Sequence, residues 1–126
     1  NEFEAAMGLC ILDDIEEIMK KIRIIWESYK KELEGYVEFQ KLNPNADYNY
    51  SYFPALFESE SQLLKVKEEL NKHQIYPSLD TLPYIEPKQE CPISRDISKR
   101  ILCLPLYAEL EEEIQYKIIS IIKRSL

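Results

Sequence analysis

The chain has 126 residues, the size of one domain, and its 16 Lys and Arg against 23 Asp and Glu give a formal net charge of −7. An acidic balance argues against nucleic-acid binding, which needs clustered positive charge, and no apolar run approaches the roughly 20 residues of a membrane-spanning helix. The three cysteines lack a metal-binding spacing, so we expect buried free thiols and a cytoplasmic protein.

Residues 1–34 predict one long helix. Asn1 can cap its start, and Gly35 follows its end. A straight helix of this length would span roughly 50 Å, more than the diameter of a compact domain of this size. We therefore expect its first turns to contact something outside this chain, and Trp26 to anchor its middle in the core. Apolar or small residues recur at steps of four and three, which places them on one helical face: Gly8, Leu12, Ile15, Met19, Ile22, Trp26, Tyr29 and Leu33.

Two strands, a helix and a loop follow. Residues 36–42 alternate apolar and polar side chains, which predicts a strand with one wet face. Residues 48–57 are apolar on both faces and predict a more central strand, with Pro54 at a bulge or an unpaired position. Ser59 can cap a helix that ends near His73. Prolines then predict a surface loop between residues 75 and 89, because they exclude regular helix there: Pro77, Pro83 and Pro87.

The last third predicts a helix, a strand and a helix. Ser94 can cap a short helix, and residues 102–106 form an apolar run that predicts a strand buried on both faces. Residues 109–126 predict a final helix with carboxylates in its first turn and basic residues in its last, as the helix dipole favours. The predicted fold class is α+β: a small, mostly antiparallel three-stranded sheet packed with helices and led by one long N-terminal helix.

Few residues could carry chemistry. His73 is the only histidine, so a triad would have to combine it with Ser78, Asp80 or Cys91. Nothing in their spacing supports a triad, and we interpret His73 as a solvated residue at a helix end. The acidic residues 109–113 are explained by the helix dipole rather than by a metal ion. Two glycines are too few for a phosphate-binding loop.

Three aromatic residues at strand spacing admit two interpretations. Tyr48, Tyr50 and Tyr52 could form a stacking face for a base or a sugar. Aromatic residues in a strand are more often part of the core, so we favour packing.

Three stretches, in order along the chain, resemble one family. Asn1–Leu9 (NEFEAAMGL) resembles the segment that opens the small domain of the DegT/DnrJ/StrS aminotransferases. Residues 50–57 (YSYFPALF) resemble the Tyr-Phe-Pro strand of that family, and residues 101–107 (ILCLPLY) its Leu-Pro-Leu-Tyr strand. The family consists of pyridoxal-phosphate (PLP) enzymes that aminate keto-sugars carried on nucleotides. The resemblance implies the small-domain fold of fold-type-I aminotransferases.

The resemblance also implies a function. Residues 1–126 would be the C-terminal small domain of a longer enzyme that transfers an amino group from glutamate to a nucleotide-linked keto-deoxysugar, for a surface polysaccharide or an antibiotic sugar. PLP and its lysine would lie in a large domain upstream of Asn1, so this chain alone should bind no PLP and be inactive. The implied partners are that large domain and the second subunit of a homodimer.

The resemblance points to five substrate-adjacent residues. Glu2 and Phe3 match the family segment beside the active site, although capping and anchoring the helix would explain them equally well. After Ile75-Tyr76-Pro77, members of the family usually continue with an Arg-Arg-Tyr-Phe-Tyr-Pro-like insert that reaches toward the substrate. Here Ser78-Leu79 follows directly, which indicates either a naturally short loop or a mobile stretch left out of this sequence. Tyr76, Pro77 and Ser78 are what remains of that segment.

Two other functions are compatible with the sequence. An interaction module could pair through its long N-terminal helix in a coiled coil, but Ile11, Ile18 and Ile25 lie where a coiled coil carries charges, which favours burial within a domain. A standalone hydrolase is the third alternative. Residues 2–9 are apolar almost all round, and we expect them to be exposed without the large domain. They would then either self-associate or fray, and the small residues Ala5, Ala6 and Gly8 favour self-association.

Overall fold

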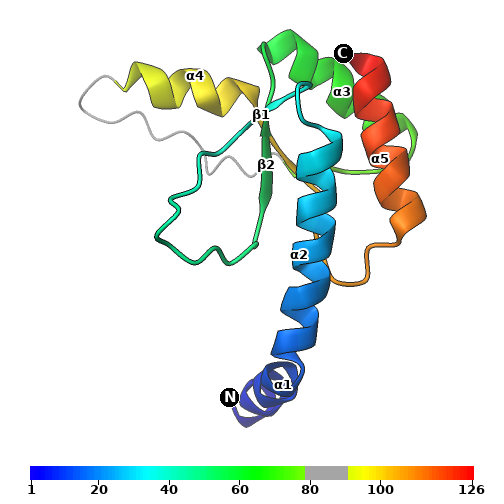
Figure 1. Ribbon diagram of the computed structural model, residues 1–126. Coiled ribbons are helices and arrows are strands. Elements are labelled where there is room, and N and C mark those ends of the chain that lie inside the picture. The colour runs from blue at the N-terminus through cyan, green and yellow to red at the C-terminus, as the bar shows by residue number, and fades with distance from the viewer. Residues whose placement is uncertain (79–90) are drawn as a thin grey trace.

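The computed structural model describes residues 1–78 and 91–126, which form five helices and a three-stranded sheet. The elements follow the predicted order, with the N-terminal helix in two parts (Figure 1). Pro83, Pro87 and most of the predicted proline-rich loop lie outside the described residues. The helices are α1 (Glu2–Asp13), α2 (Ile15–Glu32), α3 (Glu60–Lys72), α4 (Pro92–Arg100) and α5 (Glu112–Ser125), and the strands are β1 (Glu38–Phe39), β2 (Phe53–Leu56) and β3 (Ile101–Leu104).

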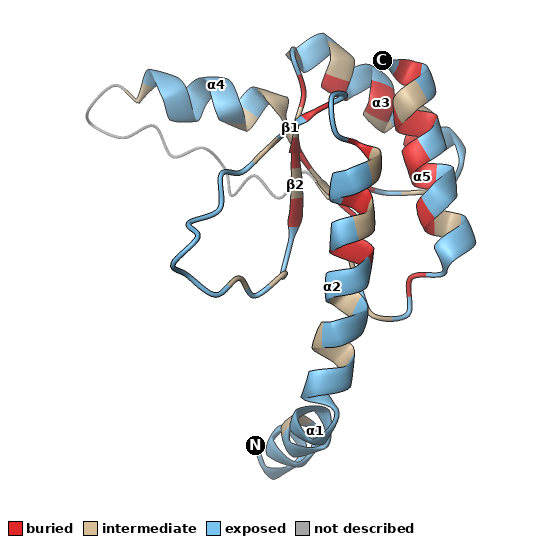
Figure 2. Ribbon diagram, viewed as in Figure 1, coloured by how far each residue is buried: buried red, intermediate tan, exposed pale blue. Residues whose placement is uncertain are grey.

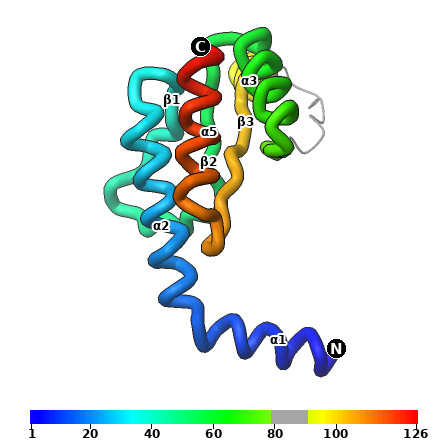
Figure 3. The backbone as a smooth tube through the Cα atoms, turned by 90° about the vertical axis from the view of Figure 1, so that its right-hand side faces the viewer, coloured from blue at the N-terminus to red at the C-terminus, as the bar shows by residue number. Residues whose placement is uncertain are grey.

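The sheet is antiparallel, with β2 in the centre between β1 and β3. Side chains alternate along β2: Phe53 and Ala55 are buried, whereas Pro54 and Leu56 are half-buried. Helices α2 and α5 pack side by side, and α3 packs on α5 (Figures 1 and 3). The three helices share one core with the buried face of the sheet. This arrangement confirms the predicted α+β class.

Pro54 lies in the central strand without a bulge, because the register with β3 runs through it unbroken. Its partner Cys103 exchanges both backbone hydrogen bonds with Ser78, on the opposite side of β3. The pairing of Pro54 with Cys103 is therefore a non-hydrogen-bonded one, and the ring nitrogen faces β1. Since β1 ends at Phe39, opposite Ala55, the ladder needs no donor from Pro54. The predicted bulge or unpaired position was therefore wrong, because Pro54 is paired in register with Cys103 at a place where no hydrogen bond from its nitrogen is needed.

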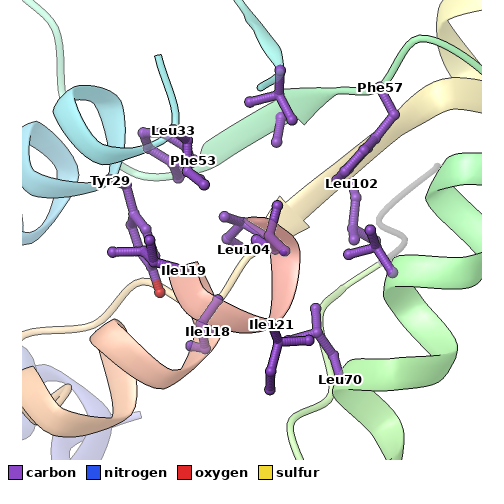
Figure 4. Packing of buried hydrophobic residues seen from close by; sticks show 14 of the residues in the cluster. Tyr29, Leu33, Phe53, Phe57, Leu70, Leu102, Leu104, Ile118, Ile119 and Ile121 are labelled. Carbon is purple, nitrogen blue, oxygen red and sulfur yellow. The ribbon is translucent and has the colours of Figure 1, made fainter. Parts of the chain in front are cut away.

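The core lies between the sheet and helices α2, α3 and α5, as Figures 2 and 4 show. Each helix contributes one stripe of apolar residues at steps of three and four. Two buried polar groups tie α2 to the last third of the chain: the Tyr29 hydroxyl donates to the Pro105 carbonyl oxygen at 3.1 Å, and the Gln115 side-chain amide donates to the Ile25 carbonyl oxygen at 2.7 Å. Burial raises the pKa of the Tyr29 hydroxyl, which keeps it a donor.

Trp26 anchors the middle of α2, as predicted. Its side chain is 6% exposed, and the indole N–H donates to the Tyr52 carbonyl oxygen at 3.2 Å. The rings of Tyr48, Tyr50 and Phe53 lie around it, with centroids 5.6, 5.5 and 5.4 Å away. The stripe predicted from Gly8 to Leu33 is therefore buried only from Trp26 onward, where α2 reaches the sheet.

The predicted N-terminal helix is helical on both sides of Asp14 but changes direction there (Figure 3). The Asp14 N–H bonds to the carbonyls of Ile11 and Leu12 and closes α1, while its carbonyl accepts from Ile18 and opens α2. The break places Glu16 and Glu17 in the first turn of α2, where the helix dipole favours negative charge. In an unbroken helix the same carboxylates would gain nothing from the dipole. Residues 1–34 therefore do not form the single straight helix that the sequence predicted.

The end of α3 has the hydrogen bonds of a Schellman motif. The Ile75 N–H bonds to the Leu70 carbonyl, and the Gln74 N–H bonds to the Asn71 carbonyl. Gln74 takes the left-handed conformation, with φ of 60°, where glycine is usual. Gly35, just beyond α2, also has a positive φ, 81°, but as a glycine it adopts this conformation without steric cost.

The strands are shorter than the sequence predicted. Tyr50 has φ of 51°, a left-handed conformation that a strand does not use, so β2 begins at Phe53 rather than Tyr48. The prediction that the third strand is buried on both faces was wrong. Ile101 and Cys103 are only half-buried, because the core-forming helices cover the other face of the sheet.

Several local predictions were also wrong. α4 begins at Pro92 after Cys91 rather than after Ser94, because proline is favoured at a first helical position. α5 begins at Glu112 rather than Glu109, since a turn in which Leu110 N–H bonds to the Tyr107 carbonyl precedes it. The cysteines are free but not buried: Cys10 is exposed on α1, and Cys91 and Cys103 are half-buried.

Truncating Trp26 should destabilise the chain strongly. We expect Trp26→Ala to lower the free energy of unfolding by about 3–5 kcal/mol, because the variant loses a buried ring and leaves a cavity. Urea unfolding followed by circular dichroism measures this. Tryptophan fluorescence is unsuitable, because the variant lacks the chain's single tryptophan. Trp26→Phe, which keeps an aromatic ring, is the control and should cost less. A loss within about 1 kcal/mol for Trp26→Ala would contradict the anchor role.

Relieving the left-handed residue after α3 should stabilise the chain. We expect Gln74→Gly to raise the free energy of unfolding by about 0.5–1 kcal/mol, because glycine adopts a positive φ without steric cost. Gly35→Ala should lower it by about 1 kcal/mol for the same reason, and a Cβ there would meet no neighbouring atom, so the effect isolates the backbone. Equal stability of Gln74→Gly and the parent would contradict the assigned strain.

Candidate functional site

The first predicted site segment is the start of α1. The Asn1 side chain accepts a hydrogen bond from the Glu4 backbone N–H at 2.9 Å, and the Glu4 carboxylate accepts one from the Asn1 backbone nitrogen at 3.3 Å. This capping box fixes the backbone. The side chains of Glu2 and Phe3 remain exposed, Phe3 at 74%. Both are therefore available to a surface outside the described part of this chain.

The rest of α1 is equally uncovered. None of its residues is buried, and Figure 2 shows almost the whole helix as exposed. Figure 3 shows it extending away from the body formed by α2, α3 and α5. A contiguous apolar surface of this kind is typical of a contact with another body. Its large apolar side chains are each more than half exposed: Phe3, Met7, Leu9, Ile11 and Leu12.

The second predicted segment, Tyr76–Ser78, lies at the outer edge of β3. Ser78 and Cys103 exchange two backbone hydrogen bonds, each 3.1 Å long. Pro77 is buried, whereas the side chain of Tyr76 is 72% exposed. The backbone is thus fixed by the sheet and by the end of α3, and the Tyr76 ring is presented outward.

The structure does not bring the two segments together. α1 and α3, the helix that leads into Tyr76, lie at opposite ends of the molecule in two views (Figures 1 and 3). Within residues 1–78 and 91–126, no hydrogen bond or ion pair joins Glu2 or Phe3 to Tyr76–Ser78. A role beside a substrate remains a prediction for all five residues.

His73 caps the C-terminal end of α3 and is exposed. It lines a shallow pocket with Lys65 and Arg124, between the ends of α3 and α5. No hydrogen bond in the described ranges joins it to Ser78 or Cys91, and Asp80 lies outside those ranges. The part of the chain that the structure describes also contains no group of three His, Cys, Asp or Glu side chains placed to hold a metal ion.

The tyrosines before β2 mostly pack within the protein. Tyr48 and Tyr50 lie edge to face with each other, with centroids 5.3 Å apart, and both contact Trp26. Arg23 lies over the Tyr50 ring at 5.7 Å. Only Tyr52 is exposed, at 59%. The packing interpretation is therefore confirmed for Tyr48 and Tyr50, whose rings do not form a free stacking face.

The described residues do not fit PLP as a cofactor. A lysine that forms a Schiff base needs an uncharged amine, which burial promotes. No lysine in residues 1–78 and 91–126 is buried. Hydrogen bonds to carboxylates raise the pKa of Lys21, beside Glu17, and of Lys72, beside Glu69 and Glu68. These amines stay charged, and no chemistry through PLP can be assigned to them.

The outer face of the sheet carries a small apolar pocket that sequence reasoning missed. It has a volume of about 250 Å³ and lies between α4 and the sheet, where Pro54, Leu56, Ile97 and Ile101 line it. Which face of a short strand stays open depends on the packing of distant helices, so no local signal could have found it. Catalytic pockets combine apolar walls with convergent polar groups. Here the polar lining is limited to Glu38 and Gln40 at the end of β1.

The described structure also contains no helix with the length and apolar character needed to cross a membrane. The described residues thus form a body with a hydrophobic core, from which the apolar helix α1 and the side chain of Tyr76 are exposed.

Comparison with known proteins identifies similar chains. A curated relative, dTDP-4-amino-4,6-dideoxy-D-glucose transaminase of Escherichia coli, is 31% identical over 137 residues. The match covers 97% of this chain but 37% of the relative, so the chain spans little more than a third of that protein's length.

Solved structures share the fold. An aminotransferase of Streptoalloteichus hindustanus superposes with a TM-score of 0.82 at 18% identity, covering 96% of this chain and 35% of the other. A putative sugar aminotransferase of Streptococcus pneumoniae in its PLP form superposes with a TM-score of 0.78 at 16% identity, covering 100% of this chain and 36% of the other. The second match covers the whole chain, α1 included. The family model of the DegT/DnrJ/EryC1/StrS aminotransferases matches residues 1–123, and the chain belongs to that family.

Proposed function

We propose that this chain is the C-terminal small domain of a PLP-dependent aminotransferase that transfers an amino group from glutamate to a nucleotide-linked keto-deoxysugar. One observation carries the proposal: the family match runs from residue 1 to residue 123, yet the chain spans about 37% of the transaminase relative. The name of that relative supports a dTDP-linked sugar as the class of substrate.

The proposed division of labour follows from what the described residues lack. They contain no buried lysine, so the lysine and the phosphate site for PLP belong to the upstream part of the longer protein. This domain supplies a stable body with its own core, and α1 as the element that docks against the large domain. A homodimer and a cytoplasmic location are further parts of the proposal; the free cysteines support the latter.

Tyr76 is the best candidate among the described residues for a contact with the substrate. Its ring is exposed on a backbone that is fixed by Ser78 and β3. The alignment with the Escherichia coli relative runs over 137 positions, more than the 126 residues of this chain, so the relative contains residues without a counterpart here. This agrees with a shortened segment after Pro77. We propose a correspondingly more open substrate site.

The 126-residue chain alone should neither bind PLP nor transaminate. After incubation with PLP and removal of the excess, we expect no absorbance band of an internal aldimine, because no described lysine is both buried and uncharged. The longer protein, treated in the same way, is the control and should show the band. A band in the short chain that disappears when one lysine is replaced would contradict this assignment.

The activity itself is tested in the longer protein. We expect it to convert glutamate and a dTDP-linked 4-keto-6-deoxy sugar to 2-oxoglutarate and the amino sugar. Tyr76→Phe should keep most of this activity, whereas Tyr76→Ala should raise the KM for the sugar nucleotide by roughly fivefold, the scale of a lost ring contact. No transamination with any nucleotide-linked keto-sugar would overturn the proposed function. An unchanged KM in Tyr76→Ala would overturn only the role of Tyr76.

A further inference from the structure

The loop before β2 contains a modification motif that the proposed function does not use. Asn49, Tyr50 and Ser51 form an Asn-X-Ser sequence whose middle residue is not proline. The asparagine of such a motif is the acceptor in N-linked glycosylation, which attaches a sugar to the side-chain nitrogen. So short a motif also arises by chance, so the structure around it decides whether it can be used.

The motif lies in the loop between β1 and β2, which Figure 2 shows as mostly exposed. Asn49 and Ser51 are exposed, whereas Tyr48 and Tyr50, which alternate with them, are half-buried. Both tyrosine rings contact Trp26, with centroids 5.6 and 5.5 Å from it. The two tyrosines therefore hold the backbone against the body and leave Asn49 and Ser51 accessible to a second protein.

The motif is folded into an Asx turn. Asn49 Oδ1 accepts a hydrogen bond from the Ser51 backbone N–H at 3.2 Å, and Tyr50 between them has φ of 51°. The turn engages only the oxygen of the Asn49 amide. Within the part of the chain that the structure describes, neither Asn49 Nδ2 nor Ser51 Oγ makes a hydrogen bond. The nitrogen that would receive a sugar and the hydroxyl that identifies the motif are thus both unoccupied.

We infer that Asn49 is an acceptor for N-linked glycosylation, and that the transferase uses a glycosyl diphosphate donor and recognises the hydroxyl of Ser51. In the transfer, a bond forms between Asn49 Nδ2 and the anomeric carbon of the sugar, while the bond from that carbon to the diphosphate oxygen breaks. The diphosphate leaves with the bonding electrons, and one Nδ2 proton passes to a base of the transferase. No group is oxidised or reduced.

Glycosyl diphosphates come from two sources, a soluble nucleotide-linked sugar and a membrane lipid-linked sugar. The motif is typical of secreted proteins, which meet the lipid-linked donor. A cytoplasmic protein, as proposed above, meets the nucleotide-linked donor instead. The reaction at Asn49 is the same with both, and it is independent of the proposed function.

Asn43, in the same loop, is a matched internal control. It is exposed, and its Oδ1 accepts a hydrogen bond from the Asn45 backbone N–H at 3.0 Å, so its side chain forms the same kind of turn. However, Pro44 occupies the middle position, and Asn45 has no hydroxyl. Asn43 therefore shares the exposure and the turn but lacks the motif, and it should stay unmodified.

Glycosylation of the folded 126-residue chain tests the inference. One sample receives a soluble asparagine-specific glycosyltransferase with UDP-glucose, and another receives a membrane oligosaccharyltransferase with its lipid-linked glycan. We expect the intact mass to rise by one glycan in at least one sample, and the sample that changes identifies the donor. Peptide mass spectrometry should place the glycan on Asn49 and not on Asn43.

Variants test the two named side chains. Asn49→Gln should abolish the modification. Ser51→Ala should slow it roughly tenfold, the scale of one lost hydrogen bond to the transferase, and Ser51→Thr, which keeps the hydroxyl, should restore it. Circular dichroism checks that each variant folds like the parent. Equal rates for Ser51→Ala and the parent would overturn recognition through Ser51.

A synthetic peptide of residues 45–53 shows that each transferase and donor is active. If both transferases modify the peptide but neither modifies the folded chain, the loop is not an acceptor in the folded protein and the inference is overturned. Modification of Asn43 to the same extent as Asn49 would also overturn it, because exposure alone would then explain the reaction.

Discussion

The contact between α2 and the central strand holds the rest of the structure in place, and Phe53 lies at its centre. Phe53 is 1% exposed, and its ring lies 5.4 Å from that of Trp26, 5.0 Å from that of Tyr29 and 5.7 Å from that of Phe39. It reaches all three because it lies on the buried face of β2. These contacts fix the second half of α2, while the first half has no sheet beneath it. The direction in which α1 projects therefore depends on rings far from it in the sequence.

The same helical segment consequently has two environments. From Ile25 onward it belongs to a core that α3 and α5 complete, so this body is held together by residues of the chain itself. Before that point its apolar residues are exposed on α1 and only half-buried at Ile18, Met19 and Ile22 of α2. Full burial of a large apolar side chain contributes about 1.5–3 kcal/mol, and the five on α1 are between 54% and 74% exposed, so covering them would release roughly 5–9 kcal/mol before the costs of docking. That is comparable to the whole stability of a small domain. An uncovered α1 is thus the strongest energetic indication that the structure offers of a missing partner.

Sequence patterns predicted the type and order of the elements because each helix carries its own stripe, as Leu63, Val66 and Leu70 do in α3. They did not predict the break at Asp14, since the apolar pattern continues across it. The start of β2 depends on the left-handed Tyr50, which no periodicity reveals. For the site, Glu2, Phe3 and Tyr76–Ser78 came from family resemblance alone. The structure adds the exposure of Glu2, Phe3 and Tyr76, and the pairing of Ser78 with Cys103, a long-range contact that local sequence cannot indicate.

The central claim is that α1 is the docking element of a small domain and lacks its partner in this chain. Hydrogen exchange of residues 2–13, read by mass spectrometry on the 126-residue chain as a proven monomer, tests it most directly. The account predicts fast exchange in α1, within the range of a fraying isolated helix, while the amides around Tyr29 and Ile118 in the core stay protected. Protection of α1 equal to that of the core in a monomer would show that the helix is already buried within this chain, and would contradict the account.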